Sequence, residues 1–340
     1  MIKIGLIGLG FMGRMHLENY MRLEQEGVPI RVTALCDFDA AKLAGQALGG
    51  NMETGTSAID FDRFAKYTSV QEMLEKEQLD MVDISLPTFL HKDIAIQCLN
   101  SGVHVLCEKP MALSSEESSA MIQAANKNEK QLMIGQCLRF WPAYEYLKEI
   151  VDSRKYGSAI SGYFYRFSSA PTWGAWLTQK EKSGGAMLDM HIHDTDMINW
   201  LFGKPQEVSA NARVVIPGSG YDIVSTNYRY EDGKVINAQA DWTMQGDFGF
   251  EMGFRVNFEG GNLLFNGDTL KVNPNGASGF YAELSPELGY YCQLKYFTEA
   301  LIHDRPLTTA LPTSTMGSMA LIEAEIESAD RNGAWVKVKP

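Results

Sequence analysis

A glycine-rich loop near residue 10 constrains the fold more than any other feature of this sequence. The segment Gly8–Gly13 reads G-L-G-F-M-G, follows the apolar run Ile2–Ile7 and precedes a segment with helical spacing of apolar residues. A G-x-G-x-x-G loop between a strand and a helix is typical of a dinucleotide-binding βαβ unit. There the first glycine makes a tight turn, the second admits a pyrophosphate, and the third lets helix and strand pack closely. The alternative is a glycine-rich structural turn.

An acidic residue after the second apolar run indicates which dinucleotide binds. Asp37 follows the run Ile30–Cys36 and lies 24 residues beyond Gly13. A carboxylate at this position accepts hydrogen bonds from the adenosine ribose hydroxyls and repels a 2′-phosphate. No arginine follows nearby, so we predict NAD rather than NADP. The alternative is that Asp37 caps the helix that begins near Asp39. The N–H groups at the start of the helix after the loop would face the phosphates of the dinucleotide. The predicted cofactor-binding residues in this region are Gly8, Gly10, Phe11, Met12, Gly13 and Asp37.

The chain changes its rhythm after about residue 125, and its 340 residues are too long for one ordinary core. Residues 1–125 alternate short apolar runs with helical patterns, two of which start with capping boxes at Ser69 and Ser114. This pattern predicts an α/β domain with a parallel sheet. Residues 126–340 contain successive extended runs separated by short turns, which predicts a mostly antiparallel sheet in an α+β domain. The extended runs are Gly162–Phe167, Glu207–Val215, Asp222–Tyr230, Val235–Met244, Phe250–Phe258 and Asn262–Leu264.

Helices are expected in the second domain near residues 183–202, 290–303 and 315–332. In the first domain we expect one helix over Ala40–Leu48, followed by a stretch at 49–63 to which we assign no function.

Charge and cysteine content limit the partners. The formal net charge is −12, which argues against nucleic acid and anionic membranes. No apolar run reaches the ~18 residues that a membrane helix needs. The five cysteines are scattered and form no C-x-x-C pair, which favours free thiols in a reducing compartment. We therefore expect a cytoplasmic protein that acts on a small molecule.

Glu108-Lys109-Pro110 follows directly after the apolar run that ends at Cys107. In an open α/β sheet, ligands bind outside the carboxyl ends of the strands. A lysine there is suited to proton transfer or to stabilising a developing alkoxide. We predict that Lys109 is catalytic. The alternative is a surface lysine paired with Glu108.

A second candidate segment contains an aspartate and a histidine four residues apart. If residues 183–202 form one helix, Asp189 and His193 share a face. Histidine accepts protons near neutral pH, and a neighbouring carboxylate fixes its tautomer. This pair predicts a general base, His193, oriented by Asp189 during oxidation of an alcohol. An ordinary polar contact is the alternative.

The same segment is rich in metal-ligand types. His191 and His193, with Asp189, Asp194 and Asp196, suggest a zinc site. On a helix, however, residues two apart point about 200° away from each other, so both histidines would not bind one ion. We therefore expect no metal.

Together these motifs resemble the Gfo/Idh/MocA family, the glucose–fructose oxidoreductase and inositol dehydrogenase group, over essentially the whole chain. Leu86–His91 resembles the family's loop after the fourth strand, Gly102–Pro110 its most specific motif, and Gly184–His193 its G-G-x-x-x-D-x-x-x-H pattern. The resemblance implies a Rossmann domain, a second domain with a large open sheet, and bound NAD(H) or NADP(H). It also implies a homodimer or homotetramer formed through that sheet.

The resemblance also implies residue roles. By this resemblance, Lys109 contacts the reacting hydroxyl. His193 accepts the proton of that hydroxyl, and Asp189 lies next to His193. The residues near the nicotinamide half of the cofactor are Leu86, Pro87, Thr88, His91, Glu108 and Lys109. Phe89 departs from the family by replacing a frequent asparagine, and His191 stands where a small residue is common.

Aromatic and basic residues suggest how a substrate binds. The faces of Trp173 and Trp176 suit the C–H faces of a sugar ring, and Arg139 suits hydroxyls or a carboxylate. Ordinary packing is the alternative for both tryptophans. We predict an NAD-dependent oxidoreductase that transfers a hydride between nicotinamide and a secondary hydroxyl or ketone of a sugar or polyol. NAD-assisted glycoside cleavage and a non-enzymatic NAD- or sugar-sensing regulator are the alternatives.

Overall fold

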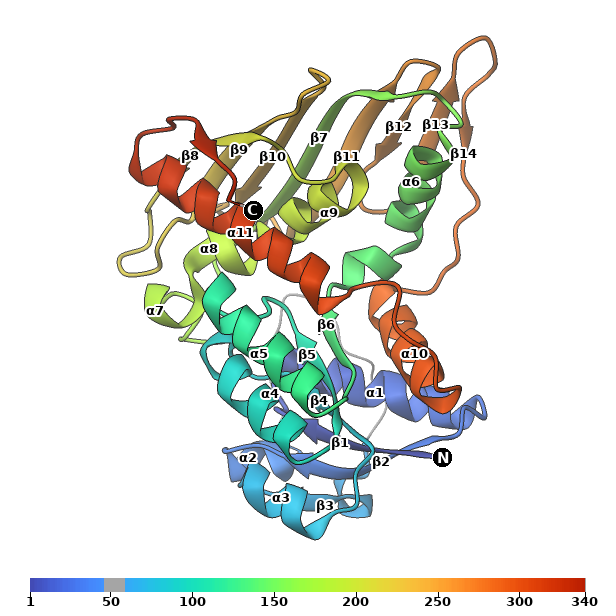
Figure 1. The fold of residues 1–340 in the computed structure, drawn as a ribbon, viewed down its shortest axis with the longest axis vertical. Coiled ribbons are helices and arrows are strands. Elements are labelled where there is room, and N and C mark those ends of the chain that lie inside the picture. Colours follow the sequence, from blue (N-terminus) through green and yellow to red (C-terminus); the bar gives the residue numbers. More distant parts are fainter. Residues whose placement is uncertain (46–58, 340) are drawn as a thin grey trace. The chain divides into compact units, whose positions relative to one another are not determined.

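A computed structural model describes residues 1–45 and 59–339, and the chain divides into two compact units (Figure 1). The first unit comprises Met1–Cys137 and Leu288–Met316, and the second comprises Leu138–Glu287 and Gly317–Pro340. The first unit thus extends beyond the predicted limit at residue 125, because a further strand pairs with its sheet. It also contains the helix Gly289–Ile302, which packs against the helix Phe11–Gln25 that follows the glycine loop.

The first unit contains the predicted parallel sheet. Its strand order is β3-β2-β1-β4-β5-β6, and every pairing is parallel. The order reverses between β1 and β4, and ligands of such sheets bind outside the carboxyl ends of the strands at that point. The strands are β1 Ile2–Ile7, β2 Ile30–Cys36, β3 Ala65–Tyr67, β4 Met81–Ile84, β5 His104–Glu108 and β6 Leu132–Gly135.

Helices cover this sheet, and their starts follow the sequence signals. Ser69 and Ser114 accept hydrogen bonds from the backbone N–H groups of Glu72 and Glu117, at 3.3 and 3.2 Å, as the capping boxes predict. Helix α2 ends at Leu43, and Ala44 and Gly45 form a turn, so the helix is shorter than predicted. Residues 46–48 of the predicted helix, with most of the 49–63 stretch, lie outside the described residues. The helices are α1 Phe11–Gln25, α2 Ala40–Leu43, α3 Val70–Lys76, α4 His91–Asn100, α5 Ser115–Lys127 and α10 Gly289–Ile302. Short 3-10 turns lie at η1 Phe61–Arg63, η2 Thr88–Leu90 and η3 Cys137–Phe140.

The second unit contains a nine-stranded sheet of order β14-β13-β12-β11-β7-β10-β9-β8-β15. All its pairings are antiparallel except that of β7 with β10, which confirms the predicted fold class. Every predicted extended run forms a strand, whereas β13, β14 and β15 were not predicted. The strands are β7 Ala159–Ser168, β8 Glu207–Arg213, β9 Ile223–Arg229, β10 Val235–Asp241, β11 Phe250–Phe258, β12 Gly261–Phe265, β13 Leu270–Pro274, β14 Phe280–Tyr281 and β15 Val336–Lys337.

One face of this sheet is covered by helices and forms the core of the second unit (Figure 1). Leu147, Ile198 and Leu321 from three helices pack against the sheet residues Phe164 and Phe254, and all five side chains are buried. Along β7 burial alternates, as expected for a strand with one covered face. The helices of this unit are α6 Pro142–Ser153, α7 Lys180–Ser183, α8 Gly185–Asp189, α9 Ile192–Phe202 and α11 Pro312–Asp330, of which α11 begins in the first unit.

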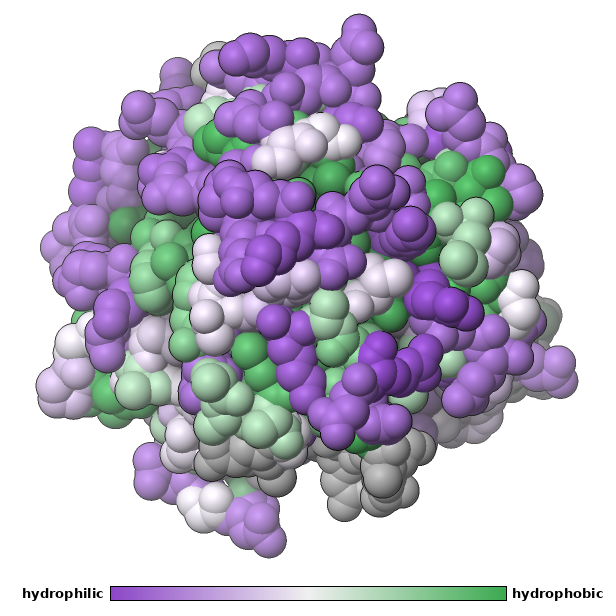
Figure 2. Space-filling model, turned by 90° about the horizontal axis from the view of Figure 1, so that it is seen from below, coloured by the Kyte–Doolittle hydropathy of each residue, from purple (hydrophilic) through white to green (hydrophobic). Residues whose placement is uncertain are grey.

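The surface is mostly hydrophilic on the face that Figure 2 presents. Figure 2 shows a face on which hydrophilic residues predominate and hydrophobic residues occur in small groups among them. Within the described ranges, every helix is too short or too polar to cross a bilayer.

Candidate active site

The glycine loop has the backbone geometry that a dinucleotide requires. A Cβ on Gly8, whose φ is +94°, would lie 2.4 Å from the carbonyl oxygen of Ser85, and one on Gly13 would lie 1.8 Å from the carbonyl oxygen of Gly8. A Cβ on Gly10 would meet no atom of the described residues within 4 Å. Two glycines are therefore required by close backbone packing, and the middle one borders open space that suits a pyrophosphate. Helix α1 begins next to this space, and no described side chain caps its N-terminus.

Asp37 joins the second strand to the glycine loop. Its carboxylate accepts the N–H groups of Leu9 at 2.7 Å and of Asp39 at 2.9 Å, and the residue is 4% exposed. Helix α2 is capped instead by Asp39, whose side chain accepts the N–H of Ala41 at 2.9 Å. The alternative function for Asp37, as cap of that helix, is therefore wrong. The Nζ atom of Lys42 lies 3.6 Å from the Asp37 carboxylate.

The loop after β4 contains an unsatisfied hydroxyl. Thr88 follows Leu86 and Pro87, is 1% exposed, and its Oγ1 atom has no hydrogen-bond partner among the described residues. A buried hydroxyl without a partner costs about 1–3 kcal/mol, so this position fits a group that hydrogen-bonds to a cofactor. Phe89, at the position of the frequent asparagine, is 37% exposed.

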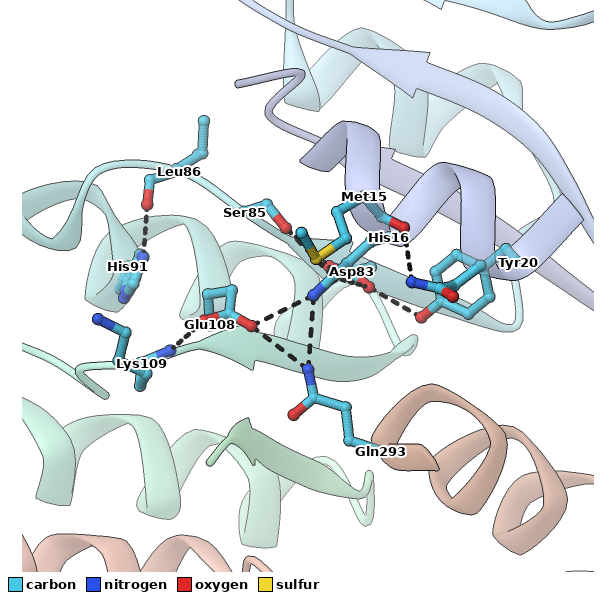
Figure 3. Close-up of polar contacts among 11 residues, drawn as sticks. Met15, His16, Tyr20, Asp83, Ser85, Leu86, His91, Glu108, Lys109 and Gln293 are labelled. Atoms are coloured by element: carbon cyan, nitrogen blue, oxygen red, sulfur yellow. Dashed lines mark hydrogen bonds and ion pairs between the residues drawn. The ribbon is translucent and has the colours of Figure 1, made fainter. Parts of the chain in front are cut away.

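His91 connects this loop to the loop after β5. Its Nε2 atom lies 2.7 Å from the carbonyl oxygen of Leu86 (Figure 3). Its Nδ1 atom lies 2.7 Å from the carbonyl oxygen of Pro110. Burial lowers the pKa of His91, and the two carbonyl groups raise it by a smaller amount. Both ring nitrogens thus face backbone carbonyl oxygens, and a neutral ring donates a hydrogen bond to one of them.

Strand β5 ends at Glu108, whose side chain turns back to its own loop. The Oε2 atom accepts the backbone N–H of Lys109 at 3.1 Å, and the Oε1 atom lies 3.4 Å from Nε2 of Gln293. Gly135 makes room for this carboxylate, since a Cβ there would lie 2.6 Å from Oε1. The hydrogen bond between Glu108 and Lys109 is therefore made by the backbone of the lysine. The peptide bond between Lys109 and Pro110 is cis.

A buried cluster that the sequence interpretation missed continues from Glu108. His16 on α1 is completely buried, with Nδ1 2.9 Å from Asp83 and Nε2 3.3 Å from Glu108. Tyr20 and Ser85 also donate hydrogen bonds to Asp83, at 2.8 and 3.1 Å (Figure 3). The signal in the sequence is an aspartate inside the otherwise apolar run Met81–Ile84, which requires a buried partner.

The charges in this cluster shift the pKa values of two members. Burial disfavours the imidazolium of His16, but Asp83 and Glu108 outweigh it and raise the pKa of His16 to about 10. Burial likewise raises the pKa of Glu108, but His16 and Lys109 outweigh it, so this pKa lies below its ordinary value.

The second candidate segment does not form one helix. Helix α8 ends at Asp189, and α9 starts at Ile192, so the argument that Asp189 and His193 share one helical face is wrong. Gly184 and Gly185 both have positive φ, and a Cβ on Gly185 would lie 2.5 Å from the carbonyl oxygen of Ser219. That close approach lies at the start of α8, where α7 ends. At the break between α8 and α9, the backbone N–H of His191 bonds instead to the carbonyl oxygen of Ala186, at 2.8 Å.

The side chains of the suggested metal site have other partners. His191 is fully buried, and its Nε2 atom lies 3.1 Å from Glu325. Asp194 pairs with Arg166 at 3.2 Å. Over residues 1–45 and 59–339 no group of three or more His, Cys, Asp or Glu residues forms a potential metal site.

The predicted substrate residues differ in exposure. Arg139 is 2% exposed, and its guanidinium donates two hydrogen bonds, at 2.8 and 2.7 Å, to the carboxylate of Asp196. Trp173 is 39% exposed and Trp176 is half-buried, so both rings retain accessible surface.

Comparison with known proteins identifies the family. Residues 2–136 match the model of the GFO/IDH/MocA oxidoreductase family with an NAD-binding Rossmann fold, and residues 144–264 match a C-terminal domain of the same family. The inositol 2-dehydrogenase of Salmonella typhimurium is 28% identical over 206 residues, 60% of this chain and 55% of that protein. The levoglucosan dehydrogenase of Pseudarthrobacter phenanthrenivorans is 30% identical over 225 residues, 64% of this chain and 55% of that protein.

Another relative has the name of a non-oxidative enzyme. The 2,7-anhydro-N-acetylneuraminate hydratase of Mediterraneibacter gnavus is 27% identical over 245 residues, 68% of this chain and 59% of that protein. The matches thus span little more than half the length of these relatives.

Solved structures show the same fold over the whole chain. A levoglucosan dehydrogenase in complex with NADH and levoglucosan superposes with a TM-score of 0.85 at 22% identity, covering 100% of both chains. The WlbA dehydrogenase of Bordetella pertussis, in complex with NADH and UDP-GlcNAcA, has a TM-score of 0.84 at 19% identity, covering 100% of this chain and 99% of that one. The chain therefore belongs to the Gfo/Idh/MocA oxidoreductase family, with its NAD-binding Rossmann fold.

Proposed function

We propose that this protein is an NAD-dependent oxidoreductase that acts on a secondary hydroxyl or ketone of a sugar or polyol. The glycine loop carries this proposal, because Gly8 and Gly13 are sterically required while Gly10 borders open space. NAD, when bound, supplies the acceptor or donor of the hydride. The names of the relatives, inositol 2-dehydrogenase and levoglucosan dehydrogenase, support the substrate class.

The first unit would hold the cofactor. The backbone N–H groups of Phe11 and Met12 suit the pyrophosphate, and Asp37 suits the adenosine ribose, which favours NAD over NADP. Leu86, Pro87 and the unsatisfied hydroxyl of Thr88 suit the nicotinamide half. His91 and Glu108 would support this half by fixing the loops, since their polar atoms contact the backbone of these loops.

The reacting hydroxyl would be held and deprotonated by three side chains. Lys109 would donate a hydrogen bond to its oxygen and stabilise the developing alkoxide, and His193 would accept its proton. Asp189 would orient the imidazole and stabilise its charge. In the reverse direction, His193 would return the proton to the ketone oxygen.

Substrate contacts would come from the accessible aromatic rings. Trp173 and Trp176 would contact the C–H faces of the sugar or polyol. Because Asp196 on α9 engages its guanidinium, Arg139 would support α9, which also carries His193, and not contact the substrate directly.

The test is NADH formation from NAD⁺ with a panel of inositols, aldoses, ketoses, sugar acids and nucleotide sugars, with NADP⁺ in parallel. Absorbance from NADH with one substrate class would establish the reaction, and a preference for NAD⁺ would support the assignment of Asp37. Silence over the panel, with NAD still binding, would contradict the dehydrogenase proposal.

The hydratase-named relative supports a second candidate reaction. In that case NAD would act transiently, as in NAD-assisted glycoside cleavage, and product would form without net NADH. Product analysis by mass spectrometry under the same conditions distinguishes the two reactions. A non-enzymatic sensor would give neither.

We also propose that the protein is a cytoplasmic homodimer or homotetramer assembled through the nine-stranded sheet. On the face of β7 opposite to the core, Tyr163, Tyr165 and Phe167 stack with centroid distances of 5.7 and 5.6 Å and remain partly exposed. Such an aromatic row on a sheet supports an interface. The five free cysteines support a reducing compartment. Light scattering after size exclusion tests the assembly, and a monomer would contradict it.

A further inference from the structure

We propose that His16 is a positioning residue for Lys109 and acts through the carboxylate of Glu108. This inference rests on the proposed function of Lys109 as the group that binds the reacting hydroxyl. His16 itself lies inside the first unit and contacts neither substrate nor the reacting atoms.

The two partners of His16 determine its charge. Both ring nitrogens face carboxylates, Nδ1 at 2.9 Å from Asp83 and Nε2 at 3.3 Å from Glu108 (Figure 3). Ionised carboxylates only accept hydrogen bonds, so both contacts are hydrogen bonds only when both ring nitrogens carry hydrogens. An imidazolium satisfies both carboxylates, whereas a neutral ring would leave one of them facing a lone pair.

Asp83 fixes the ring of His16 in this orientation. Its Oδ2 atom accepts the hydroxyl of Tyr20 at 2.8 Å, and its Oδ1 atom accepts that of Ser85 at 3.1 Å. Asp83, His16 and Tyr20 are fully buried. The position of Nε2 is therefore set by groups on α1, β4 and the residue after β4.

Glu108 transmits this position to the reacting loop. One carboxylate oxygen faces His16, and the other accepts the backbone N–H of Lys109 at 3.1 Å. On the other side of Lys109, the carbonyl oxygen of Pro110 lies 2.7 Å from His91. Both neighbours of Lys109 in the chain thus contact a buried histidine, which restricts the Lys109 backbone.

Replacing His16 tests the inference. His16→Gln removes the cation that lowers the pKa of Glu108, so Glu108 becomes protonated at higher pH. We expect kcat to fall on the order of 10- to 100-fold, as displacements of reacting groups do, and the acid limb of its pH profile to move to higher pH. NAD⁺ affinity should change little, because the glycine loop is untouched.

A double-mutant cycle with Glu108→Gln separates positioning from a general effect on the fold. If His16 acts through Glu108, His16→Gln has a much smaller effect on kcat in the Glu108→Gln background than in the wild type. An equal loss in both backgrounds, or a wild-type pH profile for His16→Gln, would overturn the inference.

Ring nitrogen NMR of the wild-type protein keeps the inference testable if His16→Gln does not fold. We expect both nitrogens of His16 to remain protonated at mildly alkaline pH. A neutral ring would contradict the inference. Turnover of Lys109→Ala is measured beside it: unchanged turnover would refute the proposed function of Lys109, whereas the NMR result concerns His16 alone.

Discussion

Each unit buries a histidine against a carboxylate, and the two clusters differ in what the second ring nitrogen faces. His16 has a carboxylate at each nitrogen. His191 faces one carboxylate, that of Glu325 at 3.1 Å from Nε2, and the hydroxyl of Thr226 lies 3.3 Å from the same nitrogen. Its Nδ1 atom has no hydrogen-bond partner among the described residues. A buried histidine therefore faces two carboxylates in one unit and one carboxylate in the other.

The two clusters also differ in the elements that they connect. Glu325 on α11 also accepts the hydroxyl of Tyr228 at 2.8 Å and that of Thr226 at 3.3 Å, both on β9. The His191 cluster thus ties a helix to the sheet. The His16 cluster ends instead at the backbone of Lys109. The comparison teaches that a buried contact between a histidine and a carboxylate can have two functions. At His191 it stabilises the fold, and at His16, as we infer, it orients a reacting group.

The largest expected effect is that of Lys109→Ala, at the end of the His16 cluster. We expect kcat to fall about 10²–10⁴-fold, because a group positioned for proton transfer or alkoxide stabilisation is lost. Steady-state NADH formation measures this, and NAD⁺ titration should show that cofactor binding is mostly kept. Lys127→Ala, in the last turn of α5 and exposed, is the matched control with wild-type turnover. Wild-type turnover in Lys109→Ala would contradict the proposal that the His16 cluster orients a reacting group.

His191→Ala tests the structural half. The substitution removes a fully buried side chain together with its contact to Glu325, so we expect the free energy of unfolding to fall by about 2–5 kcal/mol. Chemical denaturation measures this change. The pH profile of kcat should stay at its wild-type position, in contrast to His16→Gln. A shifted profile would mean that both clusters communicate with the reaction.

The pH dependence of stability sharpens the contrast between the histidines. The pKa of His16 is raised from 6.5 to about 10 in the folded state, so its contribution is complete below about 6.5 and disappears as the pH rises through about 10. We expect the unfolding free energy of the wild type to decline between neutral pH and pH of about 10, by on the order of a few kcal/mol more than that of His16→Gln. Thermal unfolding over a pH series measures this difference. Parallel curves for the two proteins would contradict a charged His16.

The smallest expected effects come from single hydroxyl deletions at the outer edge of each cluster. Tyr20→Phe removes a 2.8 Å hydrogen bond to Asp83 and should destabilise the protein by about 1.5–3 kcal/mol. Thr226→Val removes contacts at 3.3 Å to Glu325 and His191 and should cost only about 0.5–1.5 kcal/mol. Urea unfolding of the two variants gives both values. The reverse order would mean that the shorter contact is not the stronger one.

Local patterns in the sequence were sufficient to predict the strand and helices around the cofactor loop. The run Ile2–Ile7 forms β1, the helix after Gly10 begins at Phe11, and Ser69 and Ser114 cap the helices that follow them. These signals act between residues a few positions apart, where spacing and capping decide the backbone conformation.

Contacts between distant residues decided what the sequence interpretation missed. His16 and Asp83 are 67 residues apart, and Glu108 and Gln293 are 185 residues apart, so no local period connects them. The break between α7 and α8 and the short strands β13–β15 also depend on neighbours elsewhere in the chain, as Gly185 against the carbonyl oxygen of Ser219 illustrates.

The sequence by itself thus determined the fold class, the family and the identity of the candidate residues, because glycines, caps and alternating apolar residues act locally. Only the tertiary structure decided the environments of those residues. It gave His91 two backbone carbonyls, Arg139 a carboxylate partner, and His16 two carboxylates. The physical reason is that the charge and orientation of a buried group depend on the partners that folding brings to it, wherever they lie in the sequence.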